Sequence, residues 1–239
     1  MSFRPKTAML MAAGLGKRMR PLTATRPKPL IKVAGQPLID HALDRLEAAG
    51  IERTIVNVHY LADTVTAHLR SRRSPMEILI SDERERLLET GGGLMKAAAL
   101  IGDEPFVCAN SDNLWIDGPR DSIAMLADLW DDARMDALLL MVPHARANCH
   151  SGPGDFHMAA DGRLSRRKSG HVAPFVFTGV QIMSPRLLRD PPGEVFSTNI
   201  FWSRAIESGR LYGASHQGLW FDVGTPQAIP VAEYILGNG

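Results

Sequence analysis

Short apolar runs alternate with amphipathic segments along the first 143 residues, and this alternation constrains the fold more than any other feature of the chain. Because the connections are short, the pattern predicts an α/β fold, a Rossmann-like three-layer α/β/α sandwich around a mostly parallel mixed sheet. Ligands of such sheets bind beyond the carboxyl ends of the strands, so residues directly after each strand are site candidates. The expected strands lie at 7–12, 54–58, 76–80, 105–109 and 137–142, and the expected helices at 37–49, 61–71, 94–101 and 121–132.

The pattern changes after residue 143, where a stretch rich in Gly, Pro, His, Arg and Ser begins. A small β-hairpin insertion is expected there, with its turn at Asp161-Gly162. No long linker interrupts the chain, so a single domain over residues 1–239 is expected. The later strands are expected at 156–159 and 163–167, which form the hairpin, and at 175–183 and 220–224. A helix is expected at 198–208. A last helix is expected to begin with Thr225 as N-cap and Pro226 as its first residue.

Positive charge is concentrated at the start of the chain. Residues 1–39 contain eight Lys or Arg and no Asp or Glu, whereas the whole chain carries a net charge of only +1. The remaining 200 residues therefore carry a net charge of −7. Because the early basic residues are mixed with apolar runs and turn residues, an anionic ligand explains them better than a disordered basic tail.

Composition excludes several classes of protein. Cys108 and Cys149 are too few for a disulfide framework, which favours a reduced, cytoplasmic protein. No stretch approaches the roughly 20 apolar residues of a membrane span, and no strip of basic and aromatic residues suggests nucleic acid. We therefore expect small-molecule substrates, no nucleic-acid or membrane partner, and a monomer or small homo-oligomer.

A glycine-rich, cationic loop directly follows the first expected strand. Gly14 and Gly16 allow backbone N–H groups to approach an anion closely, and Lys17 and Arg18 add positive charge. The spacing matches neither a Walker A loop nor the dinucleotide-binding fingerprint, which needs a third glycine. Lys28 follows between two prolines, which stiffen the backbone that presents its ammonium group. These residues predict a phosphate-binding site.

Residues 11–21, MAAGLGKRMRP, followed by RPKPL at 26–30, resemble the signature of the sugar-1-phosphate nucleotidyltransferases. LETGGG at 88–93 and WFDVGT at 220–225 extend the resemblance over essentially the whole chain. The short chain, the LETGGG motif and Gly154-Asp155-Phe156 are most similar to the bacterial N-acetylmuramate-1-phosphate uridylyltransferases. The resemblance implies a fold of the nucleotide-diphospho-sugar transferase type, with a nucleotide-binding part at 1–143, a sugar-binding part at 144–224 and a C-terminal helix at 225–236.

The resemblance also implies a reaction. A uridylyl group would pass from UTP to N-acetylmuramate 1-phosphate, giving UDP-N-acetylmuramate and pyrophosphate, in peptidoglycan recycling. The attacking phosphate is already an anion, so charge neutralisation and alignment matter more than a general base. The same reaction with mannose, glucose or heptose 1-phosphate and another nucleoside triphosphate is the alternative. A non-catalytic nucleotide-sugar sensor is a further one, although a sensor would be expected to lack one of the catalytic residues.

The family's site residues map onto this chain one by one. Asp112 and Asp222 would hold Mg²⁺ as cofactor, and 110 positions separate them, so only the fold can bring them together. Arg18 would hold the β- and γ-phosphates of the triphosphate, and Lys28 the α-phosphate. The backbone amides at 90–93 would read the pyrimidine edge. The nucleotide-binding residues implied are Ala12, Ala13, Gly14, Gly16, Lys17, Arg18, Lys28, Thr90 and Gly91, the catalytic residues are Arg18, Lys28, Asp112 and Asp222, and the sugar-binding residues are Asn110, Gly154 and Asp155.

Two departures from the family pattern stand out. Ser111 replaces the usual glycine before the first aspartate, and its hydroxymethyl group is expected to crowd the site. SRRKS at 165–169 replaces the Glu-Lys-Pro of many relatives, which weakens the thymidylyl and glucose alternatives. Arg166, Arg167 or Lys168 is expected to meet an anionic group of the acceptor, such as a lactyl carboxylate. A solvent-exposed basic strand is the alternative.

Overall fold

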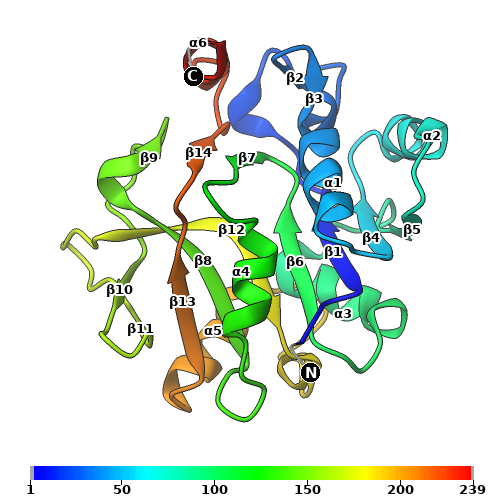
Figure 1. Ribbon diagram of the computed structural model, residues 1–239. Coiled ribbons are helices and arrows are strands. Elements are labelled where there is room, and N and C mark those ends of the chain that lie inside the picture. Colours follow the sequence, from blue (N-terminus) through cyan, green and yellow to red (C-terminus); the bar gives the residue numbers. More distant parts are fainter. Residues whose placement is uncertain (1–2, 238–239) are drawn as a thin grey trace.

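A nine-stranded sheet forms the centre of the computed structural model, which describes residues 3–237 (Figure 1). Its strands are β1 (Thr7–Met11), β4 (Arg53–Val58), β5 (Glu77–Asp82), β6 (Phe106–Asn110), β8 (Ala137–Pro143), β10 (Phe156–Met158), β11 (Leu164–Arg166), β12 (Phe175–Met183) and β13 (Leu211–Ser215). They hydrogen-bond in the order β11-β10-β12-β6-β1-β4-β5, and β8 joins β12 to β13.

The sheet is mixed in direction. The neighbours β6, β1, β4 and β5 run parallel, as the alternation of strands and helices predicted. Strand β12 runs antiparallel to all three of its neighbours, β6, β8 and β10. Because β12 is antiparallel, its first residues lie at the same edge of the sheet as the last residues of β6. That edge therefore gathers residues from both halves of the chain.

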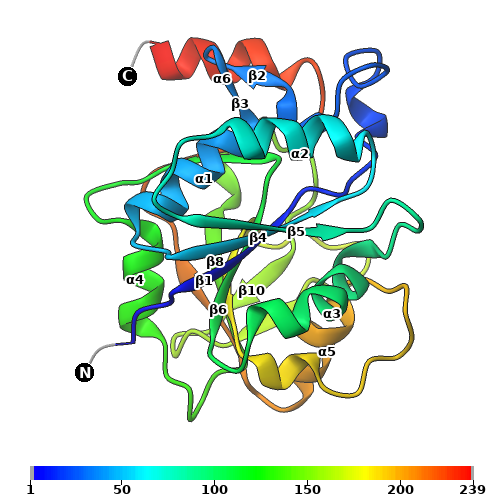
Figure 2. The ribbon, with the colours of Figure 1, turned by 90° about the vertical axis from the view of Figure 1, so that its right-hand side faces the viewer.

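Helices cover both faces of the sheet, which confirms the three-layer prediction (Figure 2). The helices are α1 (Leu38–Ala48), α2 (Ala62–Ser71), α3 (Glu89–Ile101), α4 (Ser122–Leu129), α5 (Asn199–Glu207) and α6 (Ala228–Gly237). Helices α1, α2 and α4 pack on one face, and α3 and α5 on the other. Side chains alternate between the faces along β1, so Ala8 and Leu10 join the first core and Met9 the second.

The periodicity of α1 shows why such segments become helices. Its buried residues Ile39, Ala42, Leu43 and Leu46 recur at three- and four-residue intervals, which places them in one stripe against the sheet. The chain leaves the helix at Gly50, whose φ of 82° lies in the left-handed region that glycine adopts without strain.

Short strands build a cap over the carboxyl edge of the main sheet. These strands are β7 (Asn113–Ile116), β14 (Leu219–Asp222) and β9 (Ala147–Asn148), which form one small sheet, and β2 (Lys32–Val33) with β3 (Gln36–Pro37), which form another. Together with α6 they enclose a separate apolar cluster that includes Met19, Leu114 and Phe221. Most of these strands have two to four residues, too few to show a periodicity in the sequence.

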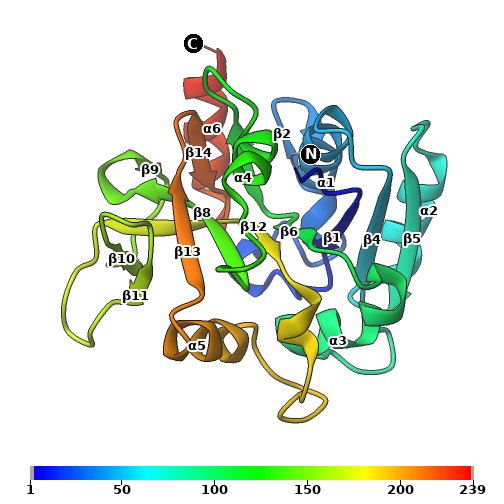
Figure 3. The same ribbon diagram turned by 60° about the horizontal axis from the view of Figure 1, so that its bottom comes forward.

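Single-turn helices complete the fold, and the later elements largely match expectation. The short helices are η1 (Lys17–Met19), η2 (Lys28–Leu30), η3 (His144–Arg146) and η4 (Pro185–Leu188). The hairpin β10–β11 forms at the edge of the sheet with a φ of 87° at Gly162 (Figure 3). Within residues 3–237, no helix combines the length and the apolar character needed to cross a bilayer.

Three predicted helix boundaries were wrong. Helix α4 ends at Leu129 rather than at residue 132. The last helix begins at Ala228, not at Thr225, because the amides of Ala228 and Ile229 bond three residues back to the carbonyls of Thr225 and Pro226, which makes a tight turn there. Helix α3 begins at Glu89 rather than at residue 94. Its three glycines lower helix propensity, but Gly91 and Gly92 pack closely against residues 194–196 and Gly93 against Glu83 and Asn57, where a larger residue would not fit.

The buried stripe of α1 gives a test of the core. Replacing fully buried Leu43 with alanine is expected to lower the free energy of unfolding by about 2–5 kcal/mol, because the change leaves a cavity under the helix. Urea denaturation measures this loss. The matched control is Leu129→Ala in α4, where the leucine is 51% exposed. An equal loss in both variants would contradict the packing described here.

Candidate active site

A cleft of about 500 Å³ opens at the carboxyl edge of the parallel strands. The loop after β1, residues 87–90 at the start of α3 and residues 110–112 after β6 form its walls. The sequence-predicted residues that line it are Ala12, Ala13, Gly14, Gly16, Lys17, Arg18, Lys28, Thr90, Asn110 and Asp112. A larger hollow of about 950 Å³, lined by Phe3, Pro105 and Arg186 among others, contains none of the predicted residues.

Gly16 bends the cationic loop back onto η2. Its φ is 61°, and a Cβ atom there would lie only 3.0 Å from side-chain carbons of Lys28 and Thr23. The hydroxyl of Thr23 donates a 2.8 Å hydrogen bond to the Gly16 carbonyl. Lys17 and Arg18 follow this bend, and within the described chain neither has an ion-pair partner. Their positive charge is therefore available to an anion in the cleft.

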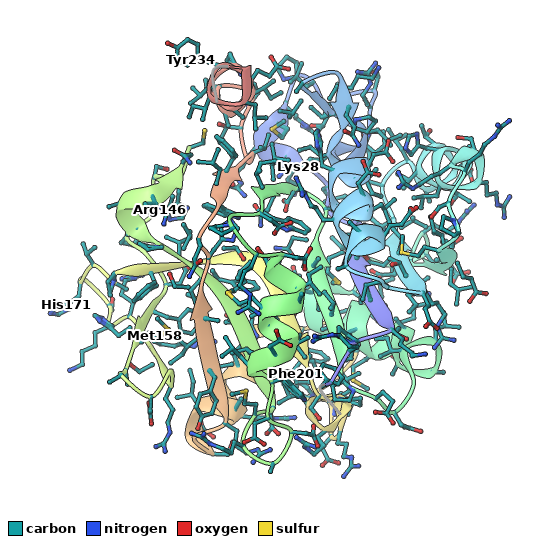
Figure 4. All side chains as sticks on the ribbon, in the orientation of Figure 1. Lys28, Arg146, Met158, His171, Phe201 and Tyr234 are labelled. Carbon is teal, nitrogen blue, oxygen red and sulfur yellow. The ribbon has the colours of Figure 1, made fainter. Side chains whose placement is uncertain are left out.

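Lys28 and Asp112 form an ion pair at the cleft. The Nζ atom of Lys28 lies 2.7 Å from Oδ2 of Asp112, and the lysine side chain is only 9% exposed. In Figure 4 Lys28 points inward beneath the cap. A buried ammonium group is stable when an opposite charge compensates its lost hydration, so this pair fixes the position of both groups.

Ser111, which was expected to crowd the site, lines the cleft with its hydroxyl bonded to the backbone. The Ser111 hydroxyl donates a 2.8 Å hydrogen bond to the carbonyl of Met11, and its backbone N–H donates to the same atom. The side chain therefore ties the end of β6 to the end of β1. The hydroxyl that replaces the family's glycine thus stabilises the edge that carries Asp112.

Asp222 reaches the same edge through strand pairing. Strand β14 runs antiparallel to β7, and Asp222 pairs with Asn113, the residue directly after Asp112. Residues opposite one another in such pairs have Cα atoms about 4.5–5.5 Å apart. Gly224 shows that Arg18 is also near Asp222. A Cβ atom placed on this glycine would lie 2.8 Å from Oδ1 of Asp222 and 3.0 Å from Nη1 of Arg18. The fold therefore brings the four predicted catalytic residues to one place.

Three residues near the aspartates were not predicted, namely His150, Asn113 and Gly179, whereas Asn110 was. His150 lies beside Asp222, with Nδ1 3.4 Å from Oδ2. Asn113 and Asn110 point their amides at Gly179, where an added Cβ would lie 2.3 Å and 3.0 Å from their Nδ2 atoms. Gly179, with φ 89°, lies where the register of β12 against β8 shifts. A glycine inside an apolar strand is the signal in the sequence that could have indicated this close approach.

The structure does not place Gly91 as expected. Its N–H donates a 2.8 Å hydrogen bond to the Phe196 carbonyl, the N–H of Gly92 donates to the same oxygen, and Gly91 does not line the cleft. An added Cβ at Gly91 would lie 2.5 Å from the Phe196 ring. The amide of Gly91 is therefore unavailable to read a base, and the glycines instead permit close packing at the start of α3.

Thr90 lines the cleft as predicted, and its hydroxyl accepts a hydrogen bond from the N–H of Thr198.

A buried hydrogen-bond chain holds two walls of the cleft together. The side-chain oxygen of Asn57 accepts a 2.7 Å bond from the N–H of Ala12, and its amide donates a 2.8 Å bond to Oε1 of Glu83. Glu83 in turn abuts Gly93 of α3, where an added Cβ would lie 2.8 Å from Oε1. Burial raises the pKa of the Glu83 carboxyl, and the bond from Asn57 offsets part of this rise. Neither residue was predicted, because each partner is distant in sequence.

Gly154 and Asp155 lie in a separate cavity of about 360 Å³. Gly154 has φ 78° and approaches the carbonyl of Ala173, and Oδ2 of Asp155 accepts a 2.9 Å bond from the N–H of Phe177. Arg167 donates to the carbonyls of Gly154, Lys168 and His171, so its guanidinium holds a loop in place. The predicted sugar-binding residues are thus divided between two cavities.

The raised pKa of Glu83 predicts a pH dependence of stability. A carboxyl whose folded pKa is raised binds its proton more tightly in the folded state, so its stabilisation is lost as pH rises from about 4.3 through the folded value. Glu83→Gln keeps an oxygen for Asn57 but does not ionise. The stability of this variant relative to the wild type is therefore expected to increase from pH 4 to pH 7 in urea denaturation. Glu85→Gln, at an exposed neighbour, is the control and should show no such trend.

Comparisons with known proteins agree with the motifs. A family model described as nucleotidyl transferase matches residues 7–149. The chain is 46% identical to N-acetylmuramate alpha-1-phosphate uridylyltransferase of Caulobacter vibrioides, with 100% of both chains covered. It is 32% identical to the protein of that name from Neisseria meningitidis serogroup B, over 96% of this chain and 98% of the other.

The fold has a solved counterpart as well. The crystal structure of a UDP-glucose pyrophosphorylase complexed with UDP-glucose matches with a TM-score of 0.81 at 16% identity, over 98% of this chain and 99% of the other. At that identity the match shows a shared fold. Together with the family model and the full-length relatives, it leads to one conclusion: the chain belongs to the nucleotidyl transferase family.

Proposed function

We propose that this protein transfers a uridylyl group from UTP to N-acetylmuramate 1-phosphate, releasing pyrophosphate. The observation that carries the transfer is that Arg18, Lys28 and Asp112 line one cleft, while strand pairing brings Asp222 opposite the residue after Asp112. The identity of the substrates is supported by the 46% identity to the Caulobacter enzyme over both full lengths. We further propose that the reaction takes place in the cytoplasm and serves the recycling of peptidoglycan.

The chemistry demands that two anions be held in line despite their repulsion. Exposed Arg18 is suited to the β- and γ-phosphates, because its planar fork matches phosphate oxygens. Buried Lys28, paired with Asp112, is positioned for the α-phosphate at the floor of the cleft. Residues 13–16 of the loop line the same space, and we place their backbone N–H groups against the phosphates. The protein thus supplies preorganised positive charge rather than a general base.

The aspartates suit a magnesium ion. Asp112 and Asp222 present hard carboxylate oxygens from adjoining positions of paired strands, the donor type that Mg²⁺ prefers. Among residues 3–237 no group of three or more metal-binding side chains occurs, which fits an ion held by two carboxylates, water and substrate phosphates. Bound there, Mg²⁺ would neutralise charge on the triphosphate.

We assign the remaining predicted residues either to the nucleotide or to the sugar. Ala12, Ala13 and Thr90 face the side of the cleft where we place the nucleoside. Asn110, together with Asp155 beyond it, would bind the acceptor sugar. On this proposal residues 1–143 bind chiefly the nucleotide and residues 144–224 chiefly the sugar, with the C-terminal helix packing over the cap.

A screen for pyrophosphate release tests the proposal. Purified protein with Mg²⁺ is offered each sugar 1-phosphate with each nucleoside triphosphate. UTP with N-acetylmuramate 1-phosphate is expected to give the highest kcat/KM. A higher value for mannose, glucose or heptose 1-phosphate with another triphosphate would overturn the assigned substrates, and no release with any pair would overturn the transfer itself.

The role of Asp112 predicts a loss of turnover. Asp112→Asn keeps the size of the side chain but removes the charge that pairs with Lys28 and would hold the metal. We expect kcat to fall by roughly three orders of magnitude, with only a modest loss of UTP binding. Steady-state kinetics and calorimetry measure the two effects. Near-normal turnover would contradict the assignment.

The role of Arg18 predicts a different pattern. Arg18→Ala should raise the KM for UTP and, in the reverse reaction, for pyrophosphate, by roughly tenfold to a hundredfold. The KM for the acceptor should change far less. Lys32→Ala, which removes one exposed positive charge from β2, is the control. If both variants behave alike, net charge rather than phosphate contact explains the effect.

A further inference from the structure

Arg166 projects into the second cavity from the end of β11. The cavity is lined by Gly154, Asp155, Phe156, Arg166, Arg167, Phe177, Asn199 and Trp202. The guanidinium of Arg166 lies 5.5 Å from the ring centre of Phe156 and 5.8 Å from that of Trp202. It donates to the side-chain oxygen and the carbonyl of Asn199 at 3.1 Å and 2.9 Å. The head of this arginine is therefore held in one place.

Among the described residues Arg166 forms no ion pair, and the carboxylate of Asp155 in the same cavity attracts it only from beyond ion-pairing distance. In the part of the chain that the structure describes, no carboxylate lies within ion-pairing distance of it, whereas Arg186 and Arg210 both pair with Asp136. The two hydrogen bonds of Arg166 go to neutral oxygens of Asn199. A guanidinium has five N–H groups, so donors remain for a further acceptor. A guanidinium that is fixed in a cavity and has unused donors can receive a carboxylate in the forked geometry.

The cavity lies within reach of the cleft. Phe177 lines the cavity, and two residues further along β12, Gly179 abuts the amides of Asn110 and Asn113. Two residues of chain span at most about 7 Å. Asn110 lines the nucleotide cleft beside Asp112. A sugar ring whose 1-phosphate lies at Asp112 can therefore extend its ring substituents towards this cavity. Figure 3 shows the β10–β11 hairpin beside β12 at this end of the sheet.

We propose that Arg166 binds a carboxylate carried by the acceptor sugar, so that the cavity selects an acidic sugar 1-phosphate over its neutral counterpart. This inference rests on the proposed function. Asp155 has one carboxylate oxygen bonded to the N–H of Phe177, and its other oxygen would accept a bond from a hydroxyl or amide of the same sugar. The bonds of Arg167 to three backbone carbonyls assign that neighbour to holding the loop rather than to the ligand.

The test compares two acceptors that differ by one group. N-acetylmuramate 1-phosphate carries a lactyl ether with a carboxylate, and N-acetylglucosamine 1-phosphate has a hydroxyl in its place. With UTP and Mg²⁺, the ratio of kcat/KM for the two acceptors is expected to fall by roughly tenfold to a hundredfold in Arg166→Ala. Arg166→Lys, which keeps the charge but loses the fork, should give an intermediate ratio.

Arg163→Ala is the matched control. Arg163 precedes the same strand and pairs with Asp161 outside the cavity, so its removal changes the charge of the hairpin equally. Its acceptor ratio should equal that of the wild type. General damage to α5 through the lost bonds to Asn199 would affect both acceptors, and the ratio separates it from loss of the carboxylate contact.

The outcomes are distinct. An unchanged ratio in Arg166→Ala, or an equal fall in Arg163→Ala, overturns the role of Arg166 and leaves the proposed function standing. If the wild type shows no preference for the lactyl-bearing acceptor, or uses neither, the proposed function fails and this inference fails with it. A fall confined to the Arg166 variants supports the inference.

Discussion

The pairing of β14 with β7 is the contact on which the site depends, because it carries Asp222 to the residue next to Asp112. Two side-chain hydrogen bonds hold β14 in place. The indole N–H of Trp220 donates to the carbonyl of Thr178 at 2.8 Å, and the amide of Asn148 donates to the Trp220 carbonyl at 3.0 Å. Trp220, Thr178 and Asn148 do not line the cleft, so these bonds position the edge without a ligand.

A small apolar cluster extends this positioning to the cations. Met19 follows Arg18, Leu114 lies two residues after Asp112, and Phe221 precedes Asp222, and all three apolar side chains pack in the cluster beneath α6. Burial of these neighbours fixes the backbone from which the charged groups project. The chain thus combines a hydrophobic core with an adjacent set of charges whose mutual arrangement is settled before substrate arrives.

Periodicity and glycine-rich motifs predicted the layers, the loop after β1 and the edge where ligands bind, because these depend on local sequence. The apolar stripe of α1 and the bend at Gly16 are examples. Contacts between distant residues could not be predicted in this way. The bonds of Asn57 to Ala12 and Glu83, the approach of His150 to Asp222 and the capture of the Gly91 amide by Phe196 all depend on tertiary packing. Glycines suggested ligand contact at residue 91, but close packing of two segments explains them.

The most direct test of the account is where a divalent ion binds. Crystals grown with Mn²⁺ in place of Mg²⁺ and a non-hydrolysable UTP analogue, measured at the manganese absorption edge, would locate the ion by its anomalous signal. The account predicts a peak within about 2–2.5 Å of a carboxylate oxygen from both Asp112 and Asp222, with the triphosphate beside Arg18. A peak held by one aspartate alone, or a triphosphate bound away from Arg18, would contradict it.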